Sequence, residues 1–333
     1  MKILVVAPSW IGDTVLAQPL LKLLHQRHEG LEVHMLAPAW TFPVVQRMPE
    51  VRRAIASPFE HGEFQFSERR DLGRELRSEG YDRAIVLPNT LKSAFVPLFA
   101  RIPMRTGYRG EMRWGALNDM RMLDENALPQ MAQRYAALGL EPGEALPETL
   151  PRPHLRIDDA KRAATLAALG LSAAGARAVA LCPGAEYGPA KRWPPSYFAE
   201  VAKRLAAQGD AVWLVGSAKD TEIGEDIVRL SGGACMNLCG KTTLDQAIEL
   251  LASARLAITN DSGLMHVAAA IDTPLIAIYG SSTPAFTPPM SPLATIAKLD
   301  IECSPCFERT CPLGHFNCMM QLKPERVLEL APR

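Results

Sequence analysis

The sequence lacks an excess of charge of either sign, a long hydrophobic run and the glycine signatures of common nucleotide-binding motifs. Its 36 Lys and Arg residues are balanced by 36 Asp and Glu residues, which argues against general nucleic-acid binding. No stretch approaches the ~20 apolar residues of a membrane span. The first apolar run is closed by Pro8 and is too short for the core of a signal peptide. We therefore expect a cytoplasmic protein that binds no nucleic acid.

Two familiar phosphate-binding motifs are also missing. The run Gly240-Lys241-Thr242-Thr243 has the end of a Walker A motif, but Cys235 stands where that motif requires its first glycine. No G-x-G-x-x-G follows a predicted strand, so a nicotinamide or flavin dehydrogenase has little support.

The sequence does contain an alternation of apolar strands and amphipathic helices. With 333 residues, the chain can form two cores of roughly 150 residues each. The segment 141–154 is rich in Pro and Glu and predicts a linker. We therefore predict an α/β fold of two Rossmann-like, doubly wound domains, residues 1–150 and 151–333, that face each other across a cleft. Predicted strands are 2–7, 32–36, 83–87, 178–182, 211–216, a short strand before Gly240, 256–259 and 274–279. Predicted helices are 14–26, 196–207, a helix from Asp220, 244–252 and 263–270.

The most informative turn follows the strand 256–259. The first amides of a helix lack intrahelical partners and lie at the positive end of its dipole, so Ser262, Gly263 and Leu264 could hold a phosphate or diphosphate. Asp261 is expected to cap this helix, and His266 lies one helical turn further on. Any strand-to-helix turn favours Asp, Ser and Gly, and a single helical histidine is more often structural. The segment by itself therefore leaves both interpretations open.

A second candidate loop, residues 183–194, follows the first strand of the second domain. Gly184 and Gly188 give the backbone room, and Lys191 and Arg192 supply cations for a phosphate. A Lys-Arg pair by itself is usually a solvated surface feature. Its position in the same predicted sheet as the Asp-Ser-Gly turn favours a diphosphate clamp.

In the first domain, the first strand ends at Pro8-Ser9-Trp10-Ile11-Gly12-Asp13. A carboxylate at this edge of the sheet can take a proton from an incoming hydroxyl, which makes Asp13 a candidate general base. The alternative is that Asp13 only caps the following helix. Gly12 permits close approach of a ligand to the backbone.

Two further clusters are candidates for binding. Between residues 84 and 115 the only acid is Glu111, so the basic residues there either meet an anionic partner or form a solvated helix face. The second cluster has the spacing C-x2-C-x4-C-x6-C, which could hold a structural zinc ion or consist of free thiols. The basic residues are Lys92, Arg101, Arg105, Arg109 and Arg113, and the thiols are Cys303, Cys306, Cys311 and Cys318.

Taken together, these segments resemble the motif series of glycosyltransferase family 9, and the resemblance extends over almost the whole chain. It implies a GT-B fold in which the N-terminal domain binds the acceptor and the C-terminal domain binds ADP-heptose. Trp10 favours the members that add heptose to the first heptose of the lipopolysaccharide inner core. The matching segments are Ser9-Trp10-Ile11-Gly12-Asp13, residues 87–94, residues 105–114, residues 183–194, Gly216-Ser217-Ala218-Lys219-Asp220 and residues 259–266.

The resemblance also implies a mechanism, an inverting displacement that requires no metal. Asp13 would be the base and Lys191 would neutralise the departing diphosphate together with the helix amides. Glu222 is a candidate partner of the ribose hydroxyls. The full set of donor-binding candidates is Gly12, Gly184, Ala185, Glu186, Lys191, Glu222, Asp261, Ser262, Gly263, Leu264 and His266.

The implied acceptor is heptosyl-Kdo-lipid A, where Kdo is 3-deoxy-manno-octulosonate, at the cytoplasmic face of the inner membrane. Its carboxylates and phosphates would meet Lys92, Arg105, Arg109 and Arg113, its sugar would meet Trp10, and the apolar face of residues 91–103 would rest near the bilayer. Two alternatives remain open at this point. One is another family 9 heptosyltransferase with a different acceptor, and the other is a cysteine-based metal-binding interaction protein.

Overall fold

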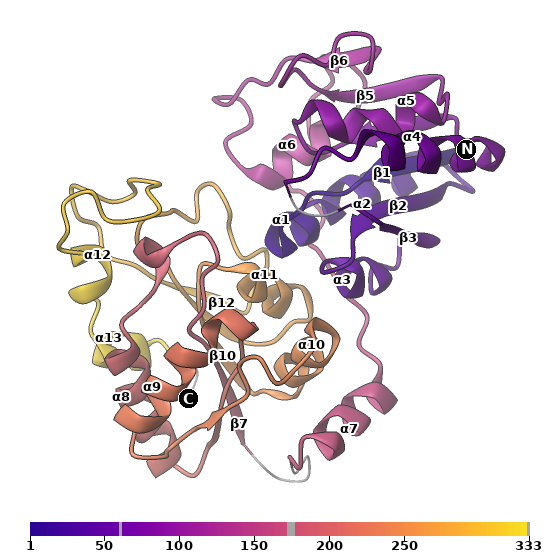
Figure 1. Ribbon diagram of the computed structural model, residues 1–333. Coiled ribbons are helices and arrows are strands. Elements are labelled where there is room, and N and C mark those ends of the chain that lie inside the picture. Colours follow the sequence, from indigo (N-terminus) through magenta and orange to yellow (C-terminus); the bar gives the residue numbers. More distant parts are fainter. Residues whose placement is uncertain (60–61, 172–176, 332–333) are drawn as a thin grey trace. The chain divides into compact units, whose positions relative to one another are not determined.

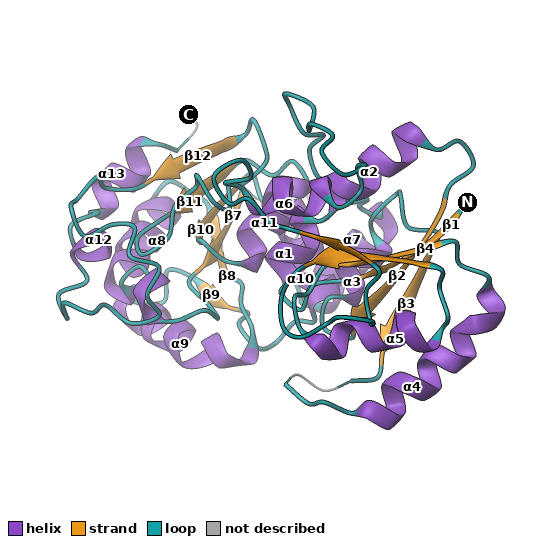
Figure 2. Ribbon diagram, turned by 90° about the horizontal axis from the view of Figure 1, so that it is seen from above, coloured by secondary structure: helices purple, strands orange, loops and turns teal. Residues whose placement is uncertain are grey.

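The computed structural model describes residues 1–59, 62–171 and 177–331. The chain divides into two compact units, Met1–Leu155 and Arg156–Arg333, and each unit is built on a six-stranded parallel sheet (Figure 1). Helices lie on both sides of the strands in each unit (Figure 2). The predicted fold class, two doubly wound Rossmann-like α/β units, is confirmed. Within the described residues, no helix is both long enough and apolar enough to cross a bilayer.

Unit 1 has the strand order β3-β2-β1-β4-β5-β6. Its strands are β1 (Lys2–Val6), β2 (Glu32–Pro38), β3 (Arg53–Ser57), β4 (Arg83–Val86), β5 (Met104–Tyr108) and β6 (Asp119–Arg121). Its α-helices are α1 (Ile11–Leu16), α2 (Gln18–Arg27), α3 (Phe42–Gln46), α4 (Phe66–Glu75), α5 (Phe95–Phe99) and α6 (Met131–Ala137), with 3-10 turns η1 (Leu76–Glu79) and η2 (Leu91–Ala94).

Unit 2 has the order β12-β11-β10-β7-β8-β9, which is the same relative order as in unit 1. Its strands are β7 (Ala178–Cys182), β8 (Ala211–Leu214), β9 (Met236–Asn237), β10 (Leu256–Asn260), β11 (Leu275–Ile278) and β12 (Ala294–Ala297). Its helices are α7 (Asp159–Ala168), α8 (Pro195–Ala207), α9 (Thr221–Leu230), α10 (Leu244–Ser253), α11 (Gly263–Ala270), α12 (Asn317–Met320) and α13 (Pro324–Glu329), with η3 (Pro189–Lys191) and η4 (Ala218–Asp220).

The central strands consist largely of apolar residues because helices cover both faces of each sheet. All residues of β4, β7 and β10 are buried. In each sheet the strand order reverses at one place, between β1 and β4 in unit 1 and between β7 and β10 in unit 2. Ligands of doubly wound sheets bind at the carboxyl ends of the strands at this switch point. The candidate turns follow these four strands.

The predicted helix 14–26 is wrong in its extent. The chain instead forms α1 and α2, which are separated at Ala17. Pro19 lies in the first turn of α2 and has no N–H to continue the hydrogen bonds of α1, so the helix must restart there. The break leaves α1 as a short helix immediately after β1.

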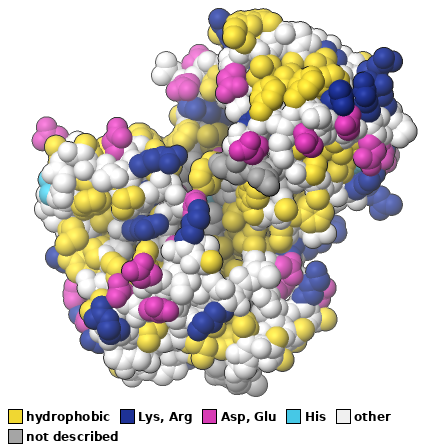
Figure 3. Space-filling view, viewed as in Figure 1, with side chains coloured by type: hydrophobic (Ala, Val, Ile, Leu, Met, Phe, Trp, Pro, Cys, Tyr) yellow, Lys and Arg dark blue, Asp and Glu magenta, His cyan; other side chains and the backbone are white. Residues whose placement is uncertain are grey.

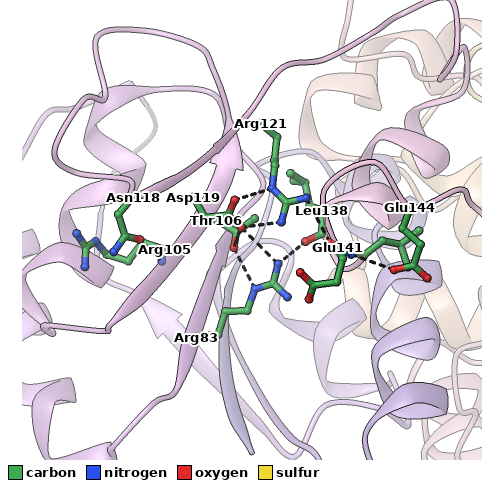
Figure 4. Close-up of polar contacts among 10 residues, drawn as sticks. Arg83, Arg105, Thr106, Asn118, Asp119, Arg121, Leu138, Glu141 and Glu144 are labelled. Carbon is green, nitrogen blue, oxygen red and sulfur yellow. Dashed lines mark hydrogen bonds and ion pairs between the residues drawn. The ribbon is translucent and has the colours of Figure 1, made fainter.

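A network of hydrogen bonds and ion pairs connects β4, β5 and β6 of unit 1 (Figure 4). The buried Arg83 donates from Nε to Thr106 Oγ1 at 3.0 Å, and Thr106 donates to Asp119 Oδ2 at 2.8 Å. Arg121 pairs with the same carboxylate, and Arg83 also donates to the carbonyl of Leu138 at 2.9 Å. These bonds join β4, β5 and β6 to the end of α6, so the network is structural.

Candidate functional site

The turn after β10 opens a helix whose first amides are available to a ligand. Ser262 is the N-cap of α11, and within the described residues no side chain caps this helix. The prediction that Asp261 caps it is wrong. The Asp261 carboxylate instead accepts hydrogen bonds from Lys191 Nζ and from Ser282 Oγ, each at 2.5 Å. A charged donor and a hydroxyl therefore hold this carboxylate away from the helix amides.

Lys191 reaches this turn from the loop after β7. It ends η3, and its ammonium lies 5.1 Å from the centre of the Tyr187 ring. The side chains of Lys191 and Asp261 are only 17% and 4% exposed, so they form a buried ion pair. The structure thus brings together two predicted phosphate-binding segments, the 183–194 loop and the 261–264 turn.

Asn260 is the residue that ties these two segments together, and sequence analysis missed it. Its buried side chain accepts from the backbone N–H of Trp193 at 3.1 Å and donates to the carbonyl of Pro183 at 2.7 Å. A buried amide satisfied on both sides fixes the spacing of the loops. The available signal was an Asn inside an otherwise apolar strand. Ser282, which also contacts Asp261, gave no such signal.

His266 lies one turn into α11 and is buried. Burial lowers the pKa of His266 to about 4, with the Asp261 carboxylate opposing this shift and Lys191 adding to it. In the described part of the chain, Nδ1 of this ring has no hydrogen-bond partner. His266 is therefore a neutral imidazole at pH 7 and cannot offer a positive charge to a ligand.

The remaining predicted residues of unit 2 have different environments. Gly184 is required at its position because a Cβ there would lie 2.5 Å from Asp220 Oδ2. Ala185 is buried, and its carbonyl accepts from Arg192. Glu186 is exposed and pairs with Lys219. Glu222 is also exposed, and it lies in the first turn of α9.

In unit 1 the carboxyl end of β1 leads directly into α1. Trp10 is the N-cap, the buried Gly12 follows, and Asp13 lies in the first turn and is half-buried. Asp13 is therefore not the N-cap residue. Burial and the negative charge of Asp13 together raise the pKa of Tyr135 well above its usual value, so this phenol of α6 lies near the carboxylate.

A second tryptophan adjoins Trp10. The indole N–H of Trp40, just after β2, donates to the carbonyl of Ser9 at 2.7 Å. Both indole side chains are partly exposed, at 44% for Trp10 and 42% for Trp40. Sequence analysis missed Trp40, although its position directly after an apolar strand matches that of Trp10.

Comparison with known proteins shows the family of this chain. The model of glycosyltransferase family 9 (heptosyltransferase) matches residues 69–317. The chain belongs to glycosyltransferase family 9. Lipopolysaccharide heptosyltransferase 2 of Escherichia coli K12 is 46% identical over 99% of this chain and 97% of its own length. Lipooligosaccharide heptosyltransferase 2 of Haemophilus influenzae is 43% identical over 99% and 98%.

A solved structure is similar to this chain in sequence and in fold over nearly the whole length. The E. coli ADP-heptose lps heptosyltransferase II is 45% identical and has a TM-score of 0.88, covering 99% of this chain and 97% of its own. The resemblance to family 9 read from the sequence motifs is therefore confirmed. The assignment of individual site residues remains a prediction.

The four basic residues that were predicted to meet the acceptor do not share one exposed surface. Arg113 is completely buried and donates to Pro88 O at 2.6 Å, to Asn89 Oδ1 at 3.2 Å and to Tyr108 O. A surface role for Arg113 is therefore wrong. Backbone carbonyls in a loop lack partners from a neighbouring strand and need other hydrogen-bond donors. The Arg113 guanidinium supplies such donors here.

Lys92 and Arg105, which were also predicted to contact the acceptor, donate hydrogen bonds to backbone carbonyls instead. Lys92 Nζ donates to Gly62 O at 2.7 Å, and Arg105 Nε donates to Ala116 O at 2.8 Å. Arg109 is exposed, with its guanidinium 5.9 Å from the centre of the exposed Trp114 ring. Of the four predicted basic contacts, Arg109 is the one whose exposure suits an anionic ligand.

The predicted zinc site at Cys303, Cys306, Cys311 and Cys318 is not supported. Across the described residues, which include all four thiols, no group of three or more His, Cys, Asp or Glu side chains is placed to hold a metal ion. Cys311 Sγ instead accepts from the backbone N–H of Phe316 at 3.4 Å. This and neighbouring backbone N–H groups lower the pKa of Cys311, so its sulfur is directed to the backbone.

Proposed function

We infer that this family 9 chain transfers L-glycero-D-manno-heptose from ADP-heptose to the first heptose of the lipopolysaccharide inner core. Similarity to heptosyltransferases 2 along the whole chain supports the substrates. The observation that carries the proposal is the Lys191–Asp261 pair at the uncapped start of α11. It lies at the switch point of a doubly wound sheet, where such folds bind nucleotides.

We propose that the diphosphate of the donor binds at the start of α11. Free N–H groups of Ser262, Gly263 and Leu264 and the positive end of the helix dipole favour a dianion there. Lys191 would exchange part of its contact with Asp261 for a phosphate oxygen. Because the helix and the lysine together stabilise the charge that develops on ADP, we propose that transfer requires no divalent metal ion.

We propose Asp13 as the base of a single inverting displacement. The acceptor hydroxyl oxygen bonds to the anomeric carbon, the bond from that carbon to the phosphate oxygen breaks, and the hydroxyl proton passes to the Asp13 carboxylate. ADP leaves without needing a proton, since Lys191 and the α11 amides stabilise its charge.

We further propose that unit 1 binds the acceptor. The exposed indoles of Trp10 and Trp40 offer apolar faces to a sugar ring, and Arg109 offers a cation to a Kdo carboxylate or phosphate. Because this acceptor has acyl chains, we propose that the enzyme acts as a peripheral protein at the cytoplasmic face of the inner membrane.

Paired acceptors test the proposal. Purified enzyme is incubated with ADP-heptose, EDTA and either heptosyl-Kdo-lipid A or the same lipid without its heptose. The masses of the products are then measured by mass spectrometry. We expect one heptose to be added to the first acceptor only, with inverted anomeric configuration by NMR. Addition to the acceptor without heptose would instead identify a family 9 enzyme with another acceptor.

A further inference from the structure

The segment 303–311 contains three of the four cysteines considered above for zinc, and the proposed mechanism does not use it. This segment is hydrogen-bonded to the loop that follows β11. Ser304 Oγ donates to the carbonyl of Gly280 at 2.7 Å, and the backbone N–H of Phe307 donates to the carbonyl of Ser281 at 2.6 Å. These two bonds hold the segment at the carboxyl end of β11.

The same segment is also bonded to the loop that follows β7. The Tyr187 hydroxyl donates to the carbonyl of Phe307 at 2.6 Å, and the N–H of Ala190 donates to the carbonyl of Arg309 at 3.0 Å. The two backbones approach so closely that a Cβ on Gly188 would overlap the carbonyl oxygen of Arg309. In the sheet, β10 lies between β11 and β7. The segment therefore connects the loops on either side of the turn that opens α11.

The ring of Tyr187 carries two cations, one from each of these segments. The Lys191 ammonium lies 5.1 Å from the ring centre, and the Arg309 guanidinium lies 5.2 Å from it. Contacts of this kind are favourable because the face of an aromatic ring is negative. Since both cations lie about 5 Å from one point, they can be no further apart than about twice that distance. The ring thus keeps Arg309 close to the lysine of the proposed donor site.

Arg309 differs from other exposed arginines of unit 2 in having no acidic partner. Figure 3 shows Lys, Arg, Asp and Glu side chains interspersed on the visible face of this unit. The exposed Arg229 and Arg326 pair with Asp226 and Glu329, respectively. Arg309 is exposed as well, but no carboxylate of the described residues forms an ion pair with its guanidinium. Its five N–H donors are therefore available to an anion.

We propose that Arg309 is a second cation of the donor site and donates hydrogen bonds to the diphosphate of ADP-heptose. A diphosphate has oxygens on two phosphorus atoms, so it can accept from Lys191 and from a guanidinium at the same time. Arginine suits this role because its planar fork of donors matches two phosphate oxygens. The inference rests on the proposed function in placing the diphosphate at the start of α11, and it adds the segment 303–311 to the donor site.

Calorimetry of the full chain with ADP tests this assignment without any acceptor. The variants are Arg309→Gln, which removes the charge, and Arg309→Lys, which keeps the charge but not the fork of donors. The matched controls are Arg229→Gln and Arg326→Gln, which change exposed arginines of the same unit. Each protein is measured at low and at high salt, and its melting temperature is recorded without ligand.

We expect Arg309→Gln to lose about ten-fold in ADP affinity, since a hydrogen bond to a charged group contributes roughly this much. Its ADP affinity should also depend less on salt, because one of the screened charges is missing. Arg309→Lys should keep the salt dependence and regain only part of the affinity. Both controls should bind ADP as the wild type does. All variants should keep the wild-type melting temperature, because the side chains that they change are exposed.

Wild-type ADP affinity in Arg309→Gln would overturn the proposal. So would an affinity loss that comes with a lowered melting temperature and an unchanged salt dependence, because that pattern identifies a structural role.

The outcome is separable from that of the proposed function. If Lys191→Ala weakens ADP binding and Arg309→Gln does not, the diphosphate site stands and the role of Arg309 fails. If ADP affinity depends on Arg309 while the wild type transfers no heptose to either acceptor, the role of Arg309 in nucleotide binding holds and the proposed transfer fails.

Discussion

Replacing Lys191 with alanine should destabilise unit 2, because it leaves a buried carboxylate without its cation. The Asp261 side chain is 4% exposed and would keep only the hydroxyl of Ser282 as a partner in this contact. Breaking a buried ion pair by removing one partner costs about 3–5 kcal/mol. The remaining Ser282 bond and the 17% exposure of the Lys191 side chain reduce this cost, so we expect a loss of about 2–4 kcal/mol in unfolding free energy.

The partner substitution should cost less. In Asp261→Asn the Lys191 ammonium keeps access to water and lies over the Tyr187 ring, so we expect a loss of about 1 kcal/mol. The double variant Lys191→Ala with Asp261→Asn contains no unpaired buried charge and should regain most of the stability that Lys191→Ala loses. It should not regain ADP affinity, because the cation that contacts the diphosphate is still missing.

Urea denaturation followed by tryptophan fluorescence measures the first effect, since the buried Trp193 and Trp213 both lie in unit 2. Calorimetry with ADP measures the second. Wild-type stability of Lys191→Ala would refute the reasoning about the buried pair. Wild-type ADP affinity in the double variant would remove Lys191 from the donor site while leaving its structural role intact.

Three further outcomes are expected. Arg113→Lys should lower the unfolding free energy by about 2–3 kcal/mol in urea denaturation, because a lysine cannot reach three carbonyl-type acceptors, whereas Arg109→Gln should change only the acceptor KM. The folded-state pKa of His266, about 4, lies below the ordinary value of 6.5, so protons favour the unfolded chain. The free energy of unfolding should therefore be highest above pH 6.5 and fall by up to about 3 kcal/mol toward pH 4. Denaturation curves measured across this pH range should show a smaller dependence for His266→Gln. Backbone N–H groups lower the pKa of Cys311, while burial raises the pKa of Cys182. Mass spectrometry after treatment with iodoacetamide should therefore find Cys311 alkylated before Cys182. Early alkylation of Cys182 would contradict its burial.

The central strands could be predicted because they are buried on both faces and therefore consist largely of apolar residues. The strands β3, β5 and β6 were not predicted, because polar or charged residues interrupt the apolar pattern in each of them. Of these, β3 and β6 are the edge strands of their sheet. In β6 the sequence Asp-Met-Arg is stabilised by the ion pair of Asp119 with Arg121 and by Arg83 from another strand. The contact of Arg83 with Asp119 joins residues that are distant in the sequence, so local patterns do not reveal it.

In the candidate site too, features set by local sequence could be predicted, and features set by contacts between distant residues could not. The turn after β10 and the loop after β7 were predicted from local sequence, because strand-turn-helix signals are local. The burial of Arg113 could not be predicted, since its acceptors belong to Pro88, Asn89 and Tyr108. The contact of Ser282 with Asp261 likewise depends on the neighbouring strand β11, which brings the two turns together at one edge of the sheet.

Asp13 as the base of a metal-independent transfer is the central claim of this account. The most direct test measures the turnover of wild type and Asp13→Asn with ADP-heptose and heptosyl-Kdo-lipid A in excess EDTA, together with ADP-heptose affinity by calorimetry. We predict full wild-type activity in EDTA, and for Asp13→Asn an unchanged donor affinity with a kcat lowered by at least about 100-fold. A near-normal kcat for Asp13→Asn, or loss of wild-type activity in EDTA, would contradict the account.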